Sequence, residues 1–242
     1  MVSKLEMGRS TPTTETIERL GAALDLPAAV QEQLQDQLAE LTIEVETLRV
    51  MHRQGGERSL QAKYAAQEAA ASVIWNYQDK VVPGLLQTPD YTRAMVPLVA
   101  PSLPDLDDLI RGRAERQRVL YDRSKSFRFL LDEAVLRRRV GPSDVLRGQL
   151  DRLTALVTAL PHVEIRVLPF GARLSRWTMT SFWIYDEVSV GVELQAGTVS
   201  VADSREVATY RDLFEHLWAH ALEGEAMVRL IRDVDAWLAR LA

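Results

Sequence analysis

The sequence predicts an α+β protein in which a helical N-terminal remnant and a long helix precede a small mixed or antiparallel sheet flanked by helices. Two observations carry this prediction. Apolar residues recur at helical spacing up to about residue 123 and again after residue 203, whereas short runs of alternating or β-branched apolar residues gather between residues 127 and 201. Strands grouped between helices in this way indicate an α+β fold.

The individual elements follow from the same periodicities. The expected helices cover residues 60–77, 105–123, 133–139, 143–160, 204–222 and 225–241. The expected strands cover residues 127–132, 163–168, 181–185, 188–194 and 198–201, with a hairpin between the last two. Pro83-Gly84 predicts a turn, and Thr88-Pro89 predicts a helix start, with threonine as N-cap and proline at the first helical position.

Composition narrows the classes of protein. The chain has 242 residues, of which 47% are hydrophobic and 26% charged, so one large domain or two small ones have ample core. The absence of cysteine excludes disulfides, thiolate metal sites and cysteine nucleophiles. There is no run of 18 apolar residues for a membrane span and no signal-peptide pattern, so we expect a cytoplasmic protein with no membrane partner. A net charge of −5 argues against strong binding to DNA phosphates.

The first segment, residues 1–27, contains a serine before an LExGxxxP run, followed by a helical apolar rhythm that stops at Leu26-Pro27. This pattern resembles the end of the recognition helix and the following helices of XRE-family (Cro/repressor-type) regulators. The resemblance implies a remnant of a helix-turn-helix domain that lacks the first helix, the positioning helix and the start of the recognition helix. It also implies that Ser3, Lys4 and Arg9 are the candidate DNA-binding residues.

Residues 28–60 are expected to form a helical connector. Its apolar residues alternate steps of four and three, which is the spacing of a coiled coil over about two heptads. These residues are Leu34, Leu38, Leu41, Val45 and Leu48. Two interpretations stay open, because so short a run fits either an amphipathic helix packed on its own domain or the seam of a homodimer. We expect Gly55-Gly56 to end this helix.

The remaining segment, residues 61–242, contains four motifs in a fixed order. They are VPGLLQTPDYTRAM from Val82, RAERQRV from Arg113, the element around residues 131–138, and residues 149–170, which end in VLPF. Together they resemble the effector domain that follows the helix-turn-helix in actinobacterial XRE regulators of the WhiJ-like type. The resemblance implies gene regulation linked to development or specialised metabolism, and a small partner protein encoded nearby.

Two polar clusters contain residue types that can bind a metal ion or act in acid/base catalysis. His216 and His220 have the spacing of metal ligands on one helix face, but the glutamate of an HExxH motif is missing, so a structural role is favoured and no metal or cofactor is expected. Asp132-Glu133 has the residues for acid/base work, yet capping of the next helix and pairing with Arg137 or Arg138 is the favoured interpretation.

Aromatic residues suggest a ligand site, because large planar side chains with polar tips suit a mainly apolar cavity. The candidate ligand-binding residues are Trp75, Tyr77, Tyr91, Trp177, Trp183 and Tyr185, with Gln87 and Arg93 as polar anchors. Alternation along the strand predicts that Trp183 and Tyr185 face the cavity while Phe182 and Ile184 face away. Simple core packing is the alternative.

Three functions are consistent with these features. The first is a regulator whose effector domain binds a small molecule or a small partner protein, with DNA as a partner only if the missing helices exist in a longer form. The second is a family domain recruited to natural-product biosynthesis, either as a binding protein or as a cofactor-free cyclase or isomerase that works by orientation in an apolar pocket. The third is a protein-interaction module. An enzyme is the less expected outcome.

Overall fold

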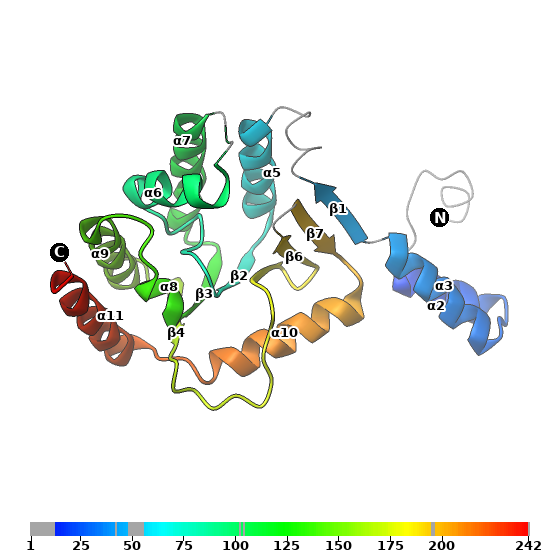
Figure 1. Cartoon of the computed structure of the whole chain (residues 1–242). Coiled ribbons are helices and arrows are strands. Elements are labelled where there is room, and N and C mark those ends of the chain that lie inside the picture. Colours follow the sequence, from blue (N-terminus) through cyan, green and yellow to red (C-terminus); the bar gives the residue numbers. More distant parts are fainter. Residues whose placement is uncertain are drawn as a thin grey trace.

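The computed structural model describes residues 13–41, 43–47, 56–101, 103, 105–194 and 197–241, and it confirms the α+β class. Its centre is a mixed, seven-stranded sheet in the order β1-β7-β6-β5-β2-β3-β4. Helices lie on both faces of this sheet, and the N-terminal helices lie beyond its β1 edge (Figure 1). No described helix combines the length and the apolar character that crossing a membrane requires.

The strands are parallel in one half of the sheet and antiparallel in the other. Three neighbouring strands run parallel: β2 (Val73–Gln78), β3 (Ser126–Asp132) and β4 (Val163–Leu168). The other four run antiparallel to their neighbours: β5 (Phe182–Tyr185), β6 (Ser189–Leu194), β7 (Gly197–Val201) and β1 (Ile43–Thr47). The parallel half needs helical crossovers, which place most of the helices on one face.

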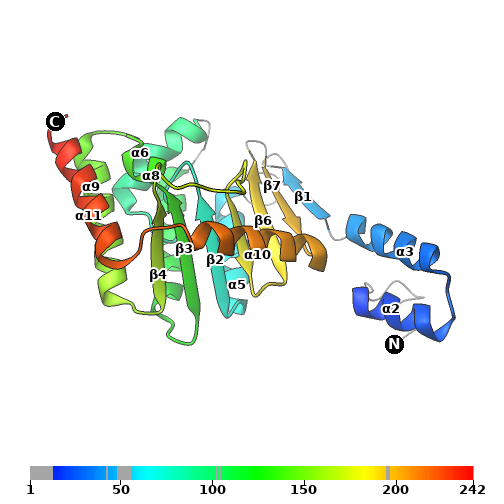
Figure 2. The ribbon, with the colours of Figure 1, turned by 90° about the horizontal axis from the view of Figure 1, so that it is seen from below.

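The helices form two unequal layers around the sheet. One face carries α5 (Gly56–Ala70), α6 (Pro89–Val99), α7 (Leu106–Arg116), α8 (Glu133–Arg137), α9 (Ser143–Ala159) and α11 (Gly224–Ala239), with a 3₁₀ turn at Gln117–Tyr121 after α7. Of the described helices, only α10 (Ser204–Trp218) covers the other face (Figure 2). Each layer has its own apolar cluster, so the central strands β2, β3 and β5 are buried on both sides.

The predicted helix over residues 60–77 is wrong in its last part, where the structure forms the central strand β2. The helix α5 ends at Ala70, and Val73–Gln78 form a strand between β3 and β5. Ile74 faces the larger apolar cluster, whereas Trp75 and Tyr77 face the cluster under α10. The alternation of apolar and polar residues is confined to the four residues from Trp75 to Gln78, and it closely follows the alanine-rich helix. The helical signal upstream therefore hid the change of period.

The N-terminal connector is also corrected. The helix α2 (Thr14–Ala23) leads to α3 (Ala28–Leu41), which stops where β1 begins to pair with β7. The heptad pattern does not continue as a helix, because Val45 lies in β1; Leu48 is outside the described residues. The sequence TIEVET is rich in β-branched residues, and the free edge of β7 supplies backbone hydrogen-bond partners. Gly56 opens α5 rather than ending a helix.

Candidate ligand-binding cavity

A cavity of about 370 Å³ lies between the sheet and the helices α5, α6 and α7. Its floor is formed by β2 and β5, its side by the ends of β6 and β7, and its rim by the loop of residues 80–87, which follows β2. Ligands of open sheets commonly bind beyond the carboxyl ends of parallel strands, where this loop lies. The volume falls within the range of small-molecule sites.

Most of the cavity wall on the helix side is apolar. Val82, Leu85, Met95, Val96 and Leu109 all line it and are buried. Towards the outside the lining continues through Ala100 and Leu103 to Val99, whose surface is 49% exposed. The apolar part of the wall therefore extends from the buried interior to the half-exposed Val99, and the charged side chains of Glu68, Arg113 and Arg116 line other parts of the helix side.

The floor of the cavity is polar. Asn76 and Gln78 stand two residues apart on β2 and both line the cavity, with Trp183 opposite Asn76 in the pairing with β5. Gln78 is only 6% exposed. Within the described part of the chain, the side chains of Asn76 and Gln78 make no hydrogen bond, and the Oδ1 atom of Asn76 is inaccessible to solvent. Buried amides without partners are uncommon and call for an explanation.

A buried ion pair closes one end of the cavity. The guanidinium of Arg116 donates to both carboxylate oxygens of Glu68, one at 3.0 Å from Nε, and to Oε1 of Gln61 at 2.6 Å. The side chains of Glu68 and Arg116 are 3% and 10% exposed. Arg116 also lies over the Tyr64 ring, 4.9 Å from its centroid. Burial raises the pKa of Glu68 above its usual value, although Arg116 acts in the opposite direction.

Tyr185 stands beside this ion pair on the cavity floor. Burial raises the pKa of its hydroxyl, and the negative charge of Glu68 adds to that effect. The hydroxyl therefore keeps its proton at neutral pH. It makes no hydrogen bond within the described residues, so it remains available as a donor to whatever occupies the cavity.

The loop at the rim is held by side-chain hydrogen bonds. Gln87 donates from Nε2 to the Val82 carbonyl at 2.6 Å, and its Oε1 accepts from Thr92 at 2.8 Å and from Arg113. The amide of Gln117 donates to the backbone carbonyl of Gln87 at 2.7 Å. Hydrogen bonds from α6, from α7 and from the turn after α7 thus hold the loop that contains the predicted Pro83-Gly84 turn, and this loop forms a fixed rim of the cavity.

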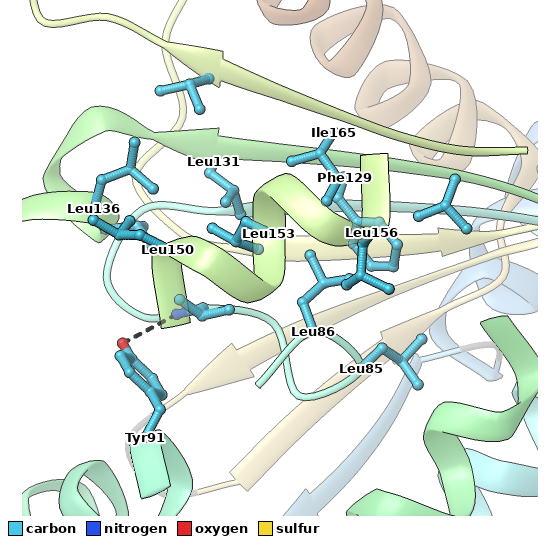
Figure 3. Packing of buried hydrophobic residues seen from close by; sticks show 14 of the residues in the cluster. Leu85, Leu86, Tyr91, Phe129, Leu131, Leu136, Leu150, Leu153, Leu156 and Ile165 are labelled. Atoms are coloured by element: carbon cyan, nitrogen blue, oxygen red, sulfur yellow. Dashed lines mark hydrogen bonds between the residues drawn. The ribbon is translucent and has the colours of Figure 1, made fainter. Parts of the chain in front are cut away.

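Gln149 of α9 fixes the other side of the same loop. It is fully buried, donates to the Leu86 carbonyl at 2.9 Å and accepts from the Thr88 amide at 2.7 Å. Thr88 is the predicted N-cap of α6, and its hydroxyl accepts from the Tyr91 amide at 3.1 Å. Figure 3 shows the apolar packing around this loop, formed by Leu85, Leu86, Phe129, Leu131, Leu136, Leu150, Leu153, Leu156 and Ile165.

Three of the sequence-predicted ligand residues line this cavity: Gln87, Trp183 and Tyr185. Phe182 and Ile184 belong to the apolar cluster on the opposite face, as the alternation along the strand requires. The predicted grouping is wrong for Trp75 and Tyr77, which the structure places on that opposite face. Trp75 stacks on Phe214 of α10 at a centroid distance of 5.0 Å. Their assumed helix is a strand, so their side of the sheet could not be foreseen.

The other predicted residues also lie away from the cavity. Tyr91 is buried in the apolar core and accepts a hydrogen bond from the Val82 amide at 3.3 Å (Figure 3). Arg93 is exposed and forms an ion pair with Asp107 at 2.7 Å. Trp177 is 65% exposed on the loop before β5. The candidate DNA-binding residues, Ser3, Lys4 and Arg9, lie outside the described residues.

Several cavity residues were missed by sequence reasoning: Tyr64, Glu68, Asn76, Gln78 and Arg116. Asn76 and Gln78 alternate with Trp75 and Tyr77, so recognition of β2 as a strand would have separated the two sets. No local signal marks Glu68 and Arg116, because they are 48 residues apart and meet only through the packing of α5 on α7.

Of the two polar clusters, Asp132-Glu133 has a structural role. The carboxylate of Asp132 accepts the Ala134 amide at 2.9 Å and caps α8, and Glu133 pairs with Arg137 at 2.7 Å. These contacts support the capping interpretation. His216 and His220 face each other with ring centroids 4.8 Å apart. Among the described residues, no group of three or more histidine, aspartate or glutamate side chains is arranged to hold a metal ion.

Comparison with known proteins gives a family but no activity. A model described as "Domain of unknown function (DUF5753)" matches residues 61–233. No curated protein matches the chain. The fold is similar to TrmBL2, an archaeal chromatin protein with a novel mode of DNA binding, at 18% identity and a TM-score of 0.39; the match covers 86% of this chain and 66% of that one.

Two further solved structures are similar over 75% of this chain, each at 9% identity. They are NucT from Helicobacter pylori, with a TM-score of 0.45 over 98% of that chain, and Nuc from Salmonella typhimurium, a phospholipase D family member, with a TM-score of 0.41 over 97% of that chain. At these levels of similarity, function has to be argued from the residues of this chain.

Proposed function

Since the chain belongs to the DUF5753 family through residues 61–233, a family without an assigned function, we propose that residues 61–242 form a small-molecule sensor domain. The ligand binds in the cavity between the sheet and α5, α6 and α7. Its occupancy is transmitted to the N-terminal segment, which resembles part of an XRE helix-turn-helix. The chain is then a regulator of the XRE type, and residues 1–60 are its output segment.

One observation carries this proposal. The cavity combines an apolar patch along α6 with the side chains of Asn76 and Gln78, which make no hydrogen bond within the described residues, and the Oδ1 atom of Asn76 is buried. A cavity that only completed the packing of the core would be filled or lined by apolar groups, because an unpaired buried amide costs free energy. A ligand with polar groups of its own removes that cost when it binds.

A chain of contacts supports the transmission step. The cavity-lining ring of Tyr64 packs edge-on against Trp183 at a centroid distance of 5.9 Å, and its hydroxyl lies 3.4 Å from the hydroxyl of Thr198 on β7. Thr198 is in register with Glu46 of β1, the strand that directly follows α3. A ligand that shifts Tyr64 therefore acts on the pairing between β7 and β1.

Binding of the neutral fluorophore N-phenyl-1-naphthylamine tests the site. Its emission increases in apolar surroundings, so the wild-type protein should enhance it with a saturable dependence on concentration. Val99→Trp places a large ring at the half-exposed mouth of the cavity and should abolish the enhancement. Val188→Trp is the matched control, because Val188 is 66% exposed and does not line the cavity. Equal binding by all three proteins would contradict the proposed site.

Hydrogen exchange tests the transmission. With the fluorophore bound, the backbone amides of β1 and β7 should exchange more slowly in the wild type, and those of Val99→Trp should not respond. Unchanged exchange in β1 despite saturable binding would show that the protein binds a ligand without transmitting its occupancy to the N-terminal segment, and would contradict the sensor proposal.

A further inference from the structure

The chemistry of the cavity lining restricts the class of ligand. Five charged residues border the cavity, and each already interacts with another group of the protein. Glu68 pairs with Arg116, Lys80 pairs with Asp79 at 2.6 Å, and Arg113 donates to Gln87. Glu193 is also engaged. A charged ligand would lose its hydration in this cavity and would have to compete with these existing contacts for a counter-charge, which is costly in a partly buried site.

The floor of the cavity also offers neutral polar groups. The amides of Asn76 and Gln78 point to the same face of β2, about 7 Å apart given the rise of two residues along a strand. Each amide carries one acceptor oxygen and two donor hydrogens. The Tyr185 hydroxyl adds a donor that keeps its proton. Together they can satisfy a ligand group that both donates and accepts hydrogen bonds.

One part of the lining is apolar and suits an apolar part of the ligand. It consists of Ile74, Leu85, Met95, Val96 and Leu109, which offer no polar side-chain atom. A polar group placed there would lose its hydration without compensation. The hydrogen-bonding group of the ligand must therefore lie at one end, over the floor, with its apolar part along α6 and α7.

On the basis of the proposed ligand site, we infer that the ligand is an uncharged molecule with an apolar body and a single amide- or lactam-like group, which hydrogen-bonds to the side chains of Asn76 and Gln78. An amide provides both a donor and an acceptor without charge, so it complements the two carboxamides. A carboxylate offers only acceptors, and an ammonium offers only donors.

Four probes with one shared apolar body test this inference by isothermal titration calorimetry. They are 1-naphthaleneacetamide, 1-naphthaleneacetate, 2-(1-naphthyl)ethylamine and 1-ethylnaphthalene. We expect the amide to bind at least about tenfold more tightly than each of the other three, which corresponds to about one net hydrogen bond. Tighter binding of the acetate or the amine would overturn the amide assignment while leaving the cavity as a ligand site.

Substitution of the floor tests the same inference from the protein side. Gln78→Met keeps the length of the side chain and removes its hydrogen bonds, so the amide should lose its advantage while 1-ethylnaphthalene binds as before. Gln67→Met is the matched control, because Gln67 is on α5 outside the cavity lining. Thermal unfolding of both variants verifies that they are folded.

The outcomes separate the two proposals. If 1-ethylnaphthalene and the amide bind equally to the wild type, the amide assignment is wrong and the proposed ligand site stands. If none of the four probes binds at concentrations of about 1 mM, both the assignment and the proposed site are contradicted.

Discussion

The indole ring of Trp183 lies over the α-carbon of Gly191, its antiparallel neighbour on β6. A β-carbon added to Gly191 would come within 2.1 Å of Cε2 and 2.4 Å of Nε1 of that ring. The absence of a side chain at Gly191 therefore sets how deep Trp183 lies against the sheet. Because Trp183 lines the cavity, this glycine also determines how much space remains above the floor.

Gly191→Ala should push the Trp183 ring towards Tyr64 and into the cavity. We expect a loss of about 1–3 kcal/mol in the free energy of unfolding, as is typical of overpacking, together with weaker binding of N-phenyl-1-naphthylamine. Urea denaturation and a fluorescence titration measure the two effects. Gly148→Ala is the control, since Gly148 lies within α9 with nothing near its added β-carbon, and it should stabilise the protein by about 0.5–1 kcal/mol. Full stability and full binding in Gly191→Ala would contradict this account.

Removal of one member of the buried ion pair should be much more costly than removal of both. Glu68→Ala leaves the guanidinium of Arg116 buried without its carboxylate, which typically costs about 3–5 kcal/mol. The double variant Glu68→Leu with Arg116→Met replaces the pair by apolar side chains and should recover most of that loss. The free energies of unfolding of the wild type, Glu68→Ala and the double variant, measured with a denaturant, test this expectation. Equal destabilisation of the single and double variants would show that the pair acts through its packing rather than its charge.

Gln149→Met should destabilise the loop before α6. The substitution preserves side-chain length, but it leaves the Leu86 carbonyl and the Thr88 amide without partners, at about 1–3 kcal/mol each. We expect a loss of about 2–4 kcal/mol in unfolding free energy and faster hydrogen exchange of the Thr88 amide. Asp151→Ala, at an exposed position of the same helix, should change stability by less than about 0.5 kcal/mol. Comparable stabilities of the two variants would refute this role.

Leu34→Glu distinguishes the observed N-terminal structure from a coiled-coil seam. Leu34 is 36% exposed on α3, and the helix stops at Leu41, so only Leu34, Leu38 and Leu41 of the apolar repeat lie on it. We expect the substitution to leave the molecular mass from light scattering unchanged and stability within about 0.5 kcal/mol. A wild-type dimer that Leu34→Glu converts to a monomer would support the interpretation of this segment as a coiled-coil dimer seam.

Some functional features were predictable from sequence because they depend on neighbours in the chain. The Thr88 and Asp132 caps and the opposite faces of Trp183 and Ile184 were all anticipated correctly. Caps need only a suitable side chain and the next few backbone amides. The side of a strand on which a residue lies follows from its parity once the strand is recognised.

The errors occurred where the local signal was short or ambiguous. Trp75 and Tyr77 were assigned to a helix because the alternation from Trp75 to Gln78 covers only four residues and directly follows an alanine-rich helical run. Val45 fitted a heptad, yet its segment pairs with β7 across about 150 residues of sequence, and such pairing is decided by a partner that is remote in the chain. Local propensity cannot report the presence of a free sheet edge.

The sequence by itself determined that this protein is α+β, where most of its strands lie, and that Trp183 and Tyr185 share one face of their strand while Phe182 and Ile184 share the other. Only the tertiary structure decided that β2 is the central strand, that Glu68 meets Arg116, and that Asn76 and Gln78 face a cavity. The physical reason is the distance along the sequence over which each feature is decided. Periodicity fixes which side chains share a face of one element, whereas a cavity exists only where several elements distant in sequence fail to fill the space between them.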